Sequence, residues 1–245
     1  MKKLVSVLAT ISVLCIALSV SNAVAETFTI LTEDYAPFNY TQEGELTGLS
    51  TEVMYEILER VKHPKKIKMM VWSEAYQQTM QNPGCVLYSM VRTKERENSF
   101  KWVGPVAPDR LVLYAKKGST LKIDSLDDAR KVARIGTYKD SVAEQFLKKE
   151  GFTNLVSVTD DKENISKLLK GKIDLWIAGE LQGIHQVKAS KSDPADLLKV
   201  FDVQDTQLYI AFNKATPDEE IAKWQKALDE LKATGVYQKI ISRYL

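Results

Sequence analysis

Cysteine and histidine are scarce in this chain of 245 residues. It contains two cysteines, Cys15 and Cys85, and two histidines, His63 and His185, which lie far apart in polar surroundings. Cys15 belongs to an N-terminal segment that we expect to be removed, and one remaining cysteine makes neither an internal disulfide nor a metal cluster. We therefore expect no metal site, no Ser-His-Asp triad and no cofactor, and a buried thiol at Cys85.

Long apolar runs are also rare, and the single one lies at the N-terminus. Two lysines precede the mostly apolar stretch Leu4–Val20, and Ala23-Val24-Ala25 has the small-x-small pattern of a cleavage site. A membrane anchor is the alternative. The run is short for a membrane span, however, and a cleavage motif follows it where an anchor has a basic flank. We expect residues 1–25 to be a signal peptide and the mature chain to begin at Glu26.

Neither sign of charge is in excess. The chain has 34 Lys+Arg and 32 Asp+Glu. Removing residues 1–25 takes away Lys2 and Lys3 and no acids, so the remaining 220 residues carry 32 basic and 32 acidic side chains. This balance does not favour nucleic acid or an anionic membrane surface as a partner.

Apolar runs of strand length alternate with amphipathic helical patterns along the mature chain. Strands are expected at Thr27–Thr32, Lys66–Trp72, Cys85–Met90, Leu111–Lys116, Ala133–Thr137, Leu155–Val158, Asp174–Ala178 and Leu208–Asn213. Helices are expected at Ser50–Val61, Glu74–Gln81, Ser125–Lys131, Ser141–Glu150, Lys162–Leu169, Gly179–Ala189, Asp218–Thr234 and Val236–Leu245. The alternation predicts an α/β fold with parallel or mixed sheets and helices on both faces.

The chain is long enough for two lobes. Two prolines bracket two small residues at Pro105–Pro108, which indicates a crossover, and a second crossover near Gln204–Gln207 would return the chain to the first lobe. We therefore expect a first lobe of residues 26–108 plus 207–245 and a second lobe of 109–206. Two crossing strands make a hinge, and the cleft between the lobes is the expected ligand site.

Several motifs resemble one known family in their order and spacing. Tyr35-Ala36-Pro37-Phe38 follows the first strand, Gly48 begins the first helix, and Thr93 to Arg96 follows the third strand. Asp140-Ser141 begins a helix, and aromatic residues lie near the C-terminus. Together these resemble the family 3 periplasmic solute-binding proteins, the amino-acid receptors of ABC importers. The resemblance covers residues 26–245 and implies the two-lobed type II periplasmic binding fold, with two mixed sheets flanked by helices and joined by a two-strand hinge.

The resemblance implies that Arg96 binds the carboxylate of the ligand. A guanidinium offers a planar fork that matches a carboxylate and stays charged in a closed cleft. The alternative is a solvated charge, because charged residues crowd the segment 92–101; Arg92 is a second candidate. Ser141 is placed at a helix N-terminus, which attracts carboxylates, and it would equally serve as a simple N-cap.

Four further residues are implied at the cleft. Tyr35 and Trp72 fall where the family places rings beside the ligand side chain, with core packing as the alternative role. Ser89 and Val91 fall at the cleft edge, where a hydroxyl and the backbone receive the ligand ammonium. The chain departs from the family at Gly179, where members commonly carry the aspartate that binds this ammonium, so Glu180 is the candidate replacement.

Three functions are consistent with these patterns. The leading one is a periplasmic solute-binding protein that is not an enzyme. It would capture a small carboxylate-bearing ligand, an amino acid or related acid, as a monomer and deliver it to a membrane ABC permease. The second is an enzyme on the same fold, similar to periplasmic cyclohexadienyl dehydratases, with Glu180 or Glu33 as general acid. The third is a ligand-sensing protein without a transport role.

Overall fold

The computed structural model of this protein describes residues 28–244. The expected signal peptide and its cleavage site lie outside the described residues. Within residues 28–244, none of the helices has the length and apolar character that a membrane span requires.

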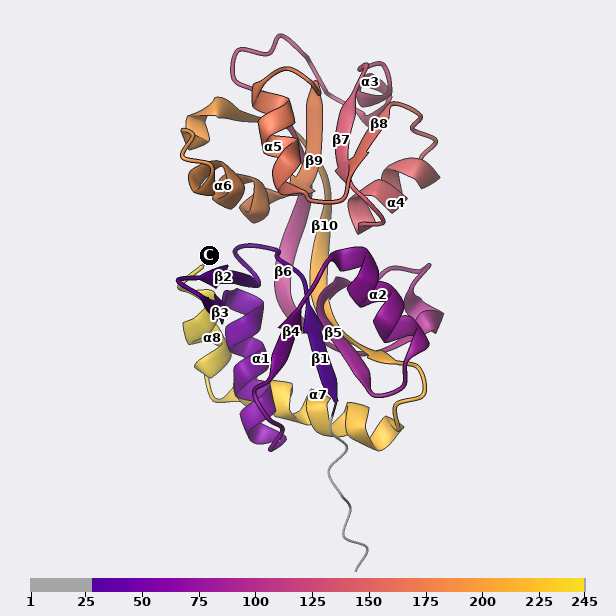
Figure 1. The fold of residues 1–245 in the computed structure, drawn as a ribbon, viewed down its shortest axis with the longest axis vertical. Helices are drawn as coiled ribbons and strands as arrows, with labels where there is room; N and C mark the ends of the chain where they lie inside the picture. The colour runs from indigo at the N-terminus through magenta and orange to yellow at the C-terminus, as the bar shows by residue number, and fades with distance from the viewer. Residues whose placement is uncertain (1–27, 245) are drawn as a thin grey trace, which may run out of the picture.

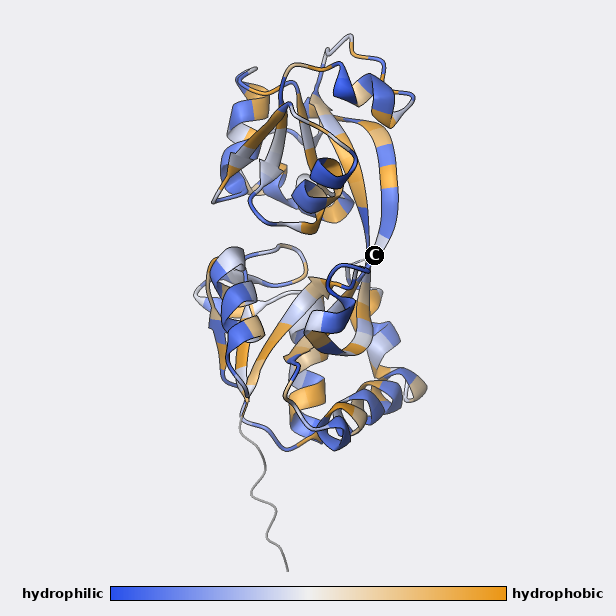
Figure 2. Ribbon diagram, turned by 90° about the vertical axis from the view of Figure 1, so that its right-hand side faces the viewer, coloured by the Kyte–Doolittle hydropathy of each residue, from blue (hydrophilic) through white to orange (hydrophobic). Residues whose placement is uncertain are grey.

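Two lobes are joined by a pair of long antiparallel strands, β6 (Phe100–Lys116) and β10 (Leu197–Asn213) (Figure 1). Both strands have 17 residues and run through both lobes, so one hydrogen-bonded array of eight strands spans the molecule. Its order is β4-β1-β5-β10-β6-β9-β7-β8. The two mixed sheets expected from the sequence are therefore the two ends of one continuous array. Figure 2 shows the hinge strands along one side of the molecule.

The first lobe contains the strands at the β4 end of this array. Its elements are β1 (Thr29–Thr32), the hairpin β2 (Tyr40–Gln42) and β3 (Glu45–Thr47), α1 (Leu49–Arg60), β4 (Ile67–Met69), α2 (Trp72–Gln81), β5 (Cys85–Val91), the short 3-10 turn η1 (Glu97–Ser99), α7 (Asp218–Ala233) and α8 (Val236–Ile241). Strand β1 pairs in parallel with β4 and β5, and β10 runs antiparallel to β5. The sheet of this lobe therefore contains both parallel and antiparallel pairs.

The second lobe contains the strands at the β8 end. Its elements are α3 (Leu126–Arg130), β7 (Ile135–Tyr138), α4 (Val142–Lys149), β8 (Leu155–Val158), α5 (Lys162–Leu169), β9 (Leu175–Gly179), α6 (Glu180–Ala189) and the 3-10 turn η2 (Pro194–Asp196). Strand β7 pairs in parallel with β8 and β9, and β9 runs antiparallel to β6. The expected alternation of strands and helices is confirmed.

Helices cover both faces of the sheet in each lobe. In α1 the expected apolar stripe is buried, with Val53, Ile57 and Leu58 fully enclosed. On the same side of the sheet, Trp224 of α7 packs edge-on against Phe212, with ring centroids 5.0 Å apart. The opposite face lies under α2, and the second lobe has two corresponding cores. Burial of these stripes fixes both lobes as rigid α/β units.

One local expectation is wrong. Trp72 does not end a strand, because β4 stops at Met69 and Trp72 is the first residue of helix α2. The segment Pro105–Pro108, predicted as a crossover, lies inside strand β6, which runs through both lobes. Strand β9 pairs only with residues 111–114 of β6, so residues 100–110 of β6 have β10 as their one neighbouring strand. The prolines are tolerated there because the edge of β6 that faces away from β10 needs no backbone N–H donor.

Candidate functional site

Both lobes bring the carboxyl ends of parallel strands to the space between them, which is where α/β sheets place ligands. In the first lobe the segment after β1 supplies Glu33 and Tyr35. In the second lobe the segments after β7 and β8 supply Ser141 and Asp161. Residues from both lobes therefore line one cavity.

This interlobe cavity is small. Its volume is about 50 Å³. The first lobe lines it with Glu33, Tyr35, Trp72, Ser89, Val91 and Arg96. The second lobe and the hinge line it with Leu111, Tyr138, Ser141, Val142, Ala143, Asp161, Ile177, Ala178, Gly179 and Gln182. Of the seven residues that the sequence predicts to touch a ligand, six lie here, and Glu180 does not.

Among the described residues, Arg96 is the only cationic side chain that lines the interlobe cavity. It is 2% exposed, and within residues 28–244 it forms no ion pair. Nη1 donates to the carbonyl oxygen of Val91 at 3.2 Å, Nη2 donates to Gln145 Oε1 at 3.1 Å, and Nε has no partner. Burial lowers the pKa of Arg96 to about 10, so the group remains cationic at neutral pH. A buried guanidinium without a counter-charge is a site for an anion.

Two carboxyl groups, Glu33 and Asp161, line the same cavity. Burial raises the pKa of Glu33 to about 8, with the charge of Asp161 as the second cause. Burial likewise raises the pKa of Asp161 to about 6, and hydrogen bonds from Asn164, Trp176 and Gln182 oppose that rise. At neutral pH Glu33 is therefore mostly protonated and Asp161 mostly ionised.

Ser89 has an unusual backbone at the cavity wall. Its φ is 64°, in the left-handed region, and it lies where the pairing of β5 with β10 shifts by one residue. Such conformations cost energy for a residue other than glycine and gather at functional sites. The Ser89 hydroxyl is buried without a hydrogen-bond partner in the described structure, so it is free to accept from or donate to a ligand.

Trp72 and Tyr138 close the cavity across the lobes. The Trp72 indole Nε1 donates to the carbonyl oxygen of Asp140 at 2.9 Å, and its backbone N–H donates to the Tyr138 hydroxyl at 3.2 Å. The Arg96 guanidinium lies 5.1 Å from the centre of the Trp72 ring, within cation–π range. Trp72 is therefore buried in the first lobe and also contacts residues at the interlobe cavity.

Charged pairs flank the cleft on the surface. Lys162 of the second lobe pairs with Asp34 of the first, and Lys149 pairs with Glu95 at 2.5 Å. Each exposed pair is worth little alone. Together with the contacts of Trp72, these pairs connect the two lobes across the cleft.

Ser141 caps helix α4 and also lines the cavity. Its hydroxyl accepts from the backbone N–H of Glu144 at 3.2 Å. The preceding Asp140 has φ 58°, a left-handed conformation that aspartate tolerates, and its side chain is exposed. The negative charge that Asp140 adds near the helix start therefore lies in solvent, and its carbonyl oxygen faces Trp72.

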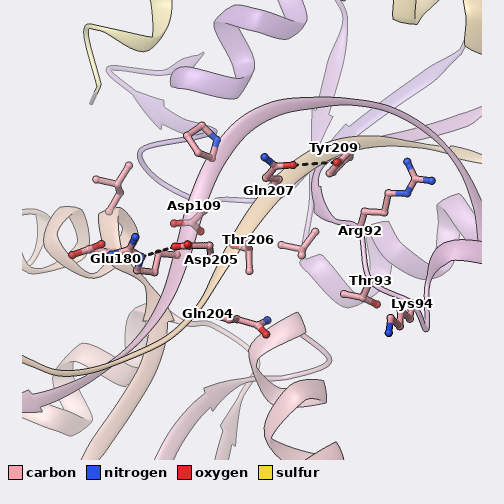
Figure 3. A pocket seen from close by; sticks show the side chains of 14 residues that line it. Arg92, Thr93, Lys94, Asp109, Glu180, Gln204, Asp205, Thr206, Gln207 and Tyr209 are labelled. Carbon is pink, nitrogen blue, oxygen red and sulfur yellow. Dashed lines mark hydrogen bonds and ion pairs between the residues drawn. The ribbon is translucent and has the colours of Figure 1, made fainter. Parts of the chain in front are cut away.

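A second, open space lies behind the cavity along the hinge strands, with a volume of about 890 Å³. We call it the hinge-side groove. Figure 3 shows Arg92, Thr93 and Lys94 on one side of it and Asp109 and Glu180 on the other. Glu180 forms an ion pair with Lys199 at 2.8 Å, and Arg92 forms one with Glu97 at 2.5 Å. Both charges are satisfied at the surface, outside the interlobe cavity.

Some site residues were not found from the sequence. Asp161, Tyr138 and Gln182 line the cavity, and Gln145 contacts Arg96 across the cleft. The sequence does contain a signal for Asp161, because the acidic pair Asp160-Asp161 lies one residue beyond the expected strand Leu155–Val158. Gln182 and Gln145 lie inside helices, where nothing in the pattern separates a cleft-facing glutamine from a solvated one.

Comparisons with known proteins agree with this geometry. The model of the bacterial extracellular solute-binding proteins, family 3, matches residues 29–245. A probable histidine-binding protein of Campylobacter jejuni subsp. jejuni is 24% identical over 221 residues, which are 86% of this chain and 81% of that protein.

Solved structures share the fold over nearly the whole described chain. A histidine kinase sensor domain with similarity to periplasmic binding proteins has a TM-score of 0.81 at 19% identity, and covers 90% of this chain and 97% of its own. An ancestral arginine-binding protein bound to arginine has a TM-score of 0.80 at 23% identity, and covers 90% of this chain and 98% of its own. At these identities the likeness is one of fold.

Proposed function

The chain belongs to the bacterial extracellular solute-binding proteins of family 3, and we propose that it captures an α-amino acid between its lobes and delivers it to a membrane ABC importer. The observation that carries the proposal is Arg96, a buried cation without a carboxylate partner in the described structure, at the wall of a cavity lined by both lobes. A ligand carboxylate would supply the missing charge, and backbone N–H groups at the start of α4 would support it.

The charges of the cavity favour a basic amino acid. Glu33 and Asp161 line it against the single cation Arg96. A ligand with one carboxylate and two cationic groups would place the carboxylate at Arg96 and a cation near the two acids. A cation beside Glu33 would also lower its raised pKa and release the proton. The histidine named for one relative and the arginine bound in one structural neighbour belong to this class.

Ligand entry requires the lobes to separate. A cavity of about 50 Å³ has room for a few ordered waters, which need about 10–15 Å³ each on this measure, and for little more. We propose that residues 26–108 plus 207–245 move as one body and 109–206 as the other, about the hinge at Pro105–Pro108 and Gln204–Gln207. Ligand contacts to both lobes would then favour the closed state.

Export completes the proposal. Cleavage after Ala25 would release a mature, monomeric chain beginning at Glu26 into the periplasm, where a membrane permease would recognise its closed form. N-terminal sequencing of periplasmic protein tests the cleavage, and an intact Met1 in a membrane fraction would contradict it.

Ligand identification is the direct test of the function. Protein purified without added amino acids is denatured, and the released small molecules are identified by mass spectrometry. We expect a basic amino acid in near-stoichiometric amount, and the same compound should raise the melting temperature of ligand-free protein. The absence of any released amino acid, together with no thermal shift from any of the twenty L-amino acids, would contradict the proposal.

Glu33 favours one second candidate, an acid-catalysed elimination. A buried carboxyl with a pKa of about 8 remains protonated at neutral pH and is suited to donate a proton to a leaving group. Incubation with prephenate, followed by NMR, would show turnover that Glu33→Gln abolishes if this candidate holds. Binding without turnover would leave the transport function.

A further inference from the structure

Gly179 leaves a space beside the interlobe cavity that another residue fills. A β-carbon at this position would lie 2.6 Å from the Tyr35 hydroxyl, 2.7 Å from Asp109 Oδ2 and 3.2 Å from Asp109 Oδ1. A side chain at position 179 would therefore require the Tyr35 hydroxyl and the Asp109 carboxylate to move. The carboxylate of Asp109, from hinge strand β6, therefore occupies the space into which a side chain at position 179 would extend.

Asp109 is buried and only half satisfied. It is 9% exposed, and the Tyr35 hydroxyl donates to Oδ2 at 2.5 Å. Oδ1 is inaccessible to solvent and has no hydrogen-bond partner, and within residues 28–244 no lysine or arginine forms an ion pair with this carboxylate. The side chain of the neighbouring Arg110 instead donates from Nε to Asp205 Oδ1 at 2.7 Å. Burial raises the pKa of Asp109 to about 6, so it remains mostly ionised at neutral pH.

A second unpartnered acceptor lies directly opposite. Thr206 of β10 pairs with Asp109 across the hinge, and its buried Oγ1 also has no partner in the described structure. Opposed residues of antiparallel strands point to the same face. Both residues line the hinge-side groove, as Figure 3 shows, and Asp109 separates that groove from Tyr35 and Gly179 at the cavity wall.

These observations define a subsite with one negative charge and a free hydroxyl. We propose that Asp109 binds the α-ammonium of the ligand, and that Gly179 is required because it leaves room for this carboxylate. The inference rests on the proposed function, since Arg96 holds the carboxylate of the same ligand.

The test compares amino acids with analogues that lack the α-ammonium. Isothermal titration uses L-arginine and L-histidine, each beside its des-amino acid, 5-guanidinopentanoate and 3-(imidazol-4-yl)propanoate. Ligand-free protein should bind at least one of the amino acids about 30-fold or more tightly than its analogue, the ratio expected for a buried charge pair. Equal affinity for amino acid and analogue would overturn the inference and leave the proposed function standing.

Asp109→Asn should lower the affinity for the amino acid about 30-fold or more and change that for the analogue less than about threefold. Asparagine preserves the acceptor for Tyr35, which favours an intact fold. The matched control is Asp174→Asn, an aspartate of the second lobe that pairs with Arg134 and lines neither the interlobe cavity nor the hinge-side groove, and it should change neither affinity. Gly179→Ala, which pushes the carboxylate aside, should reproduce the selective loss.

The remaining outcomes separate the two proposals. An Asp109→Asn variant that binds the amino acid like the parent, or that loses amino acid and analogue equally, would overturn the role of Asp109. Failure of all four compounds to bind the parent would overturn the basic-amino-acid function and this inference with it.

Discussion

Trp72 Nε1 and the carbonyl oxygen of Asp140 form a 2.9 Å hydrogen bond that joins the first residue of α2 in one lobe to the segment before α4 in the other. The proposed separation of the lobes would break this bond, because its two partners belong to different lobes. Trp72 thus links the wall of the cavity to the closure of the cleft.

Trp72→Phe should weaken ligand binding about fivefold. The variant keeps an aromatic ring near Arg96 but loses one donor, and a net hydrogen bond is worth about 1 kcal/mol. The control is Trp102→Phe, which removes an indole bond to Glu97 within the first lobe. Titration calorimetry with the ligand identified above gives the affinities, and small-angle scattering should show a larger radius of gyration for the Trp72 variant. Parent-like values in both experiments would show that this bond does not hold the closed state.

Glu33 should make stability fall as pH rises. Burial raises its pKa from 4.5 to about 8, so the folded protein retains a proton that the unfolded chain releases between these values. The associated stability is fully present below pH 4.5 and is lost as pH rises through 8. It amounts to a few kcal/mol, on the order of 1.4 kcal/mol per pH unit of that interval.

Glu33→Gln should remove this dependence. Between pH 5 and pH 8 the melting temperature of ligand-free parent should fall by several degrees more than that of the variant. Glu180→Gln is the matched control, because Glu180 is paired with Lys199 outside the cavity. Parallel curves for the parent and Glu33→Gln would show that Glu33 is not protonated in the folded protein.

Ser141→Ala should reduce both stability and binding by about 1 kcal/mol each. The hydroxyl caps α4, and loss of such a cap typically costs about that much. Backbone N–H donors at the helix start remain for the ligand, so the binding loss stays modest. Ser125→Ala is a close control, because Ser125 caps α3 in the same way, away from the cavity. If both variants lose stability and neither loses affinity, Ser141 is an N-cap alone.

Much of the fold can be predicted from local sequence patterns. The stripe of Val53, Ile57 and Leu58 identified α1 because it repeats with the helical period. Strand β6 was predicted only from Leu111, since Pro105 and Pro108 are rare inside strands. Their tolerance depends on β9 pairing further along, which is a tertiary fact that local sequence does not contain.

The site was predictable where a motif fixes position and not where distant segments meet. Arg96 lies in the cavity, where the resemblance to the family through Thr93 to Arg96 implies it. Gly179 was recognised as a gap in the expected pattern, but Asp109 precedes it by 70 positions, and only the pairing of Leu111 with Gly179 brings the two together. Glu180 was the nearest acid in sequence, yet α6 begins there and directs its side chain to Lys199.

Calorimetric titration of Arg96→Ala tests whether Arg96 binds the ligand carboxylate. With the ligand identified by mass spectrometry, the variant should lose roughly 3–5 kcal/mol of binding free energy, because its partner carboxylate would be buried without a counter-charge. Arg92→Ala should bind within about threefold of the parent, since Arg92 is an exposed neighbour paired with Glu97. A folded Arg96→Ala variant that binds like the parent would contradict the placement of the ligand carboxylate at Arg96, and with it this account of the site.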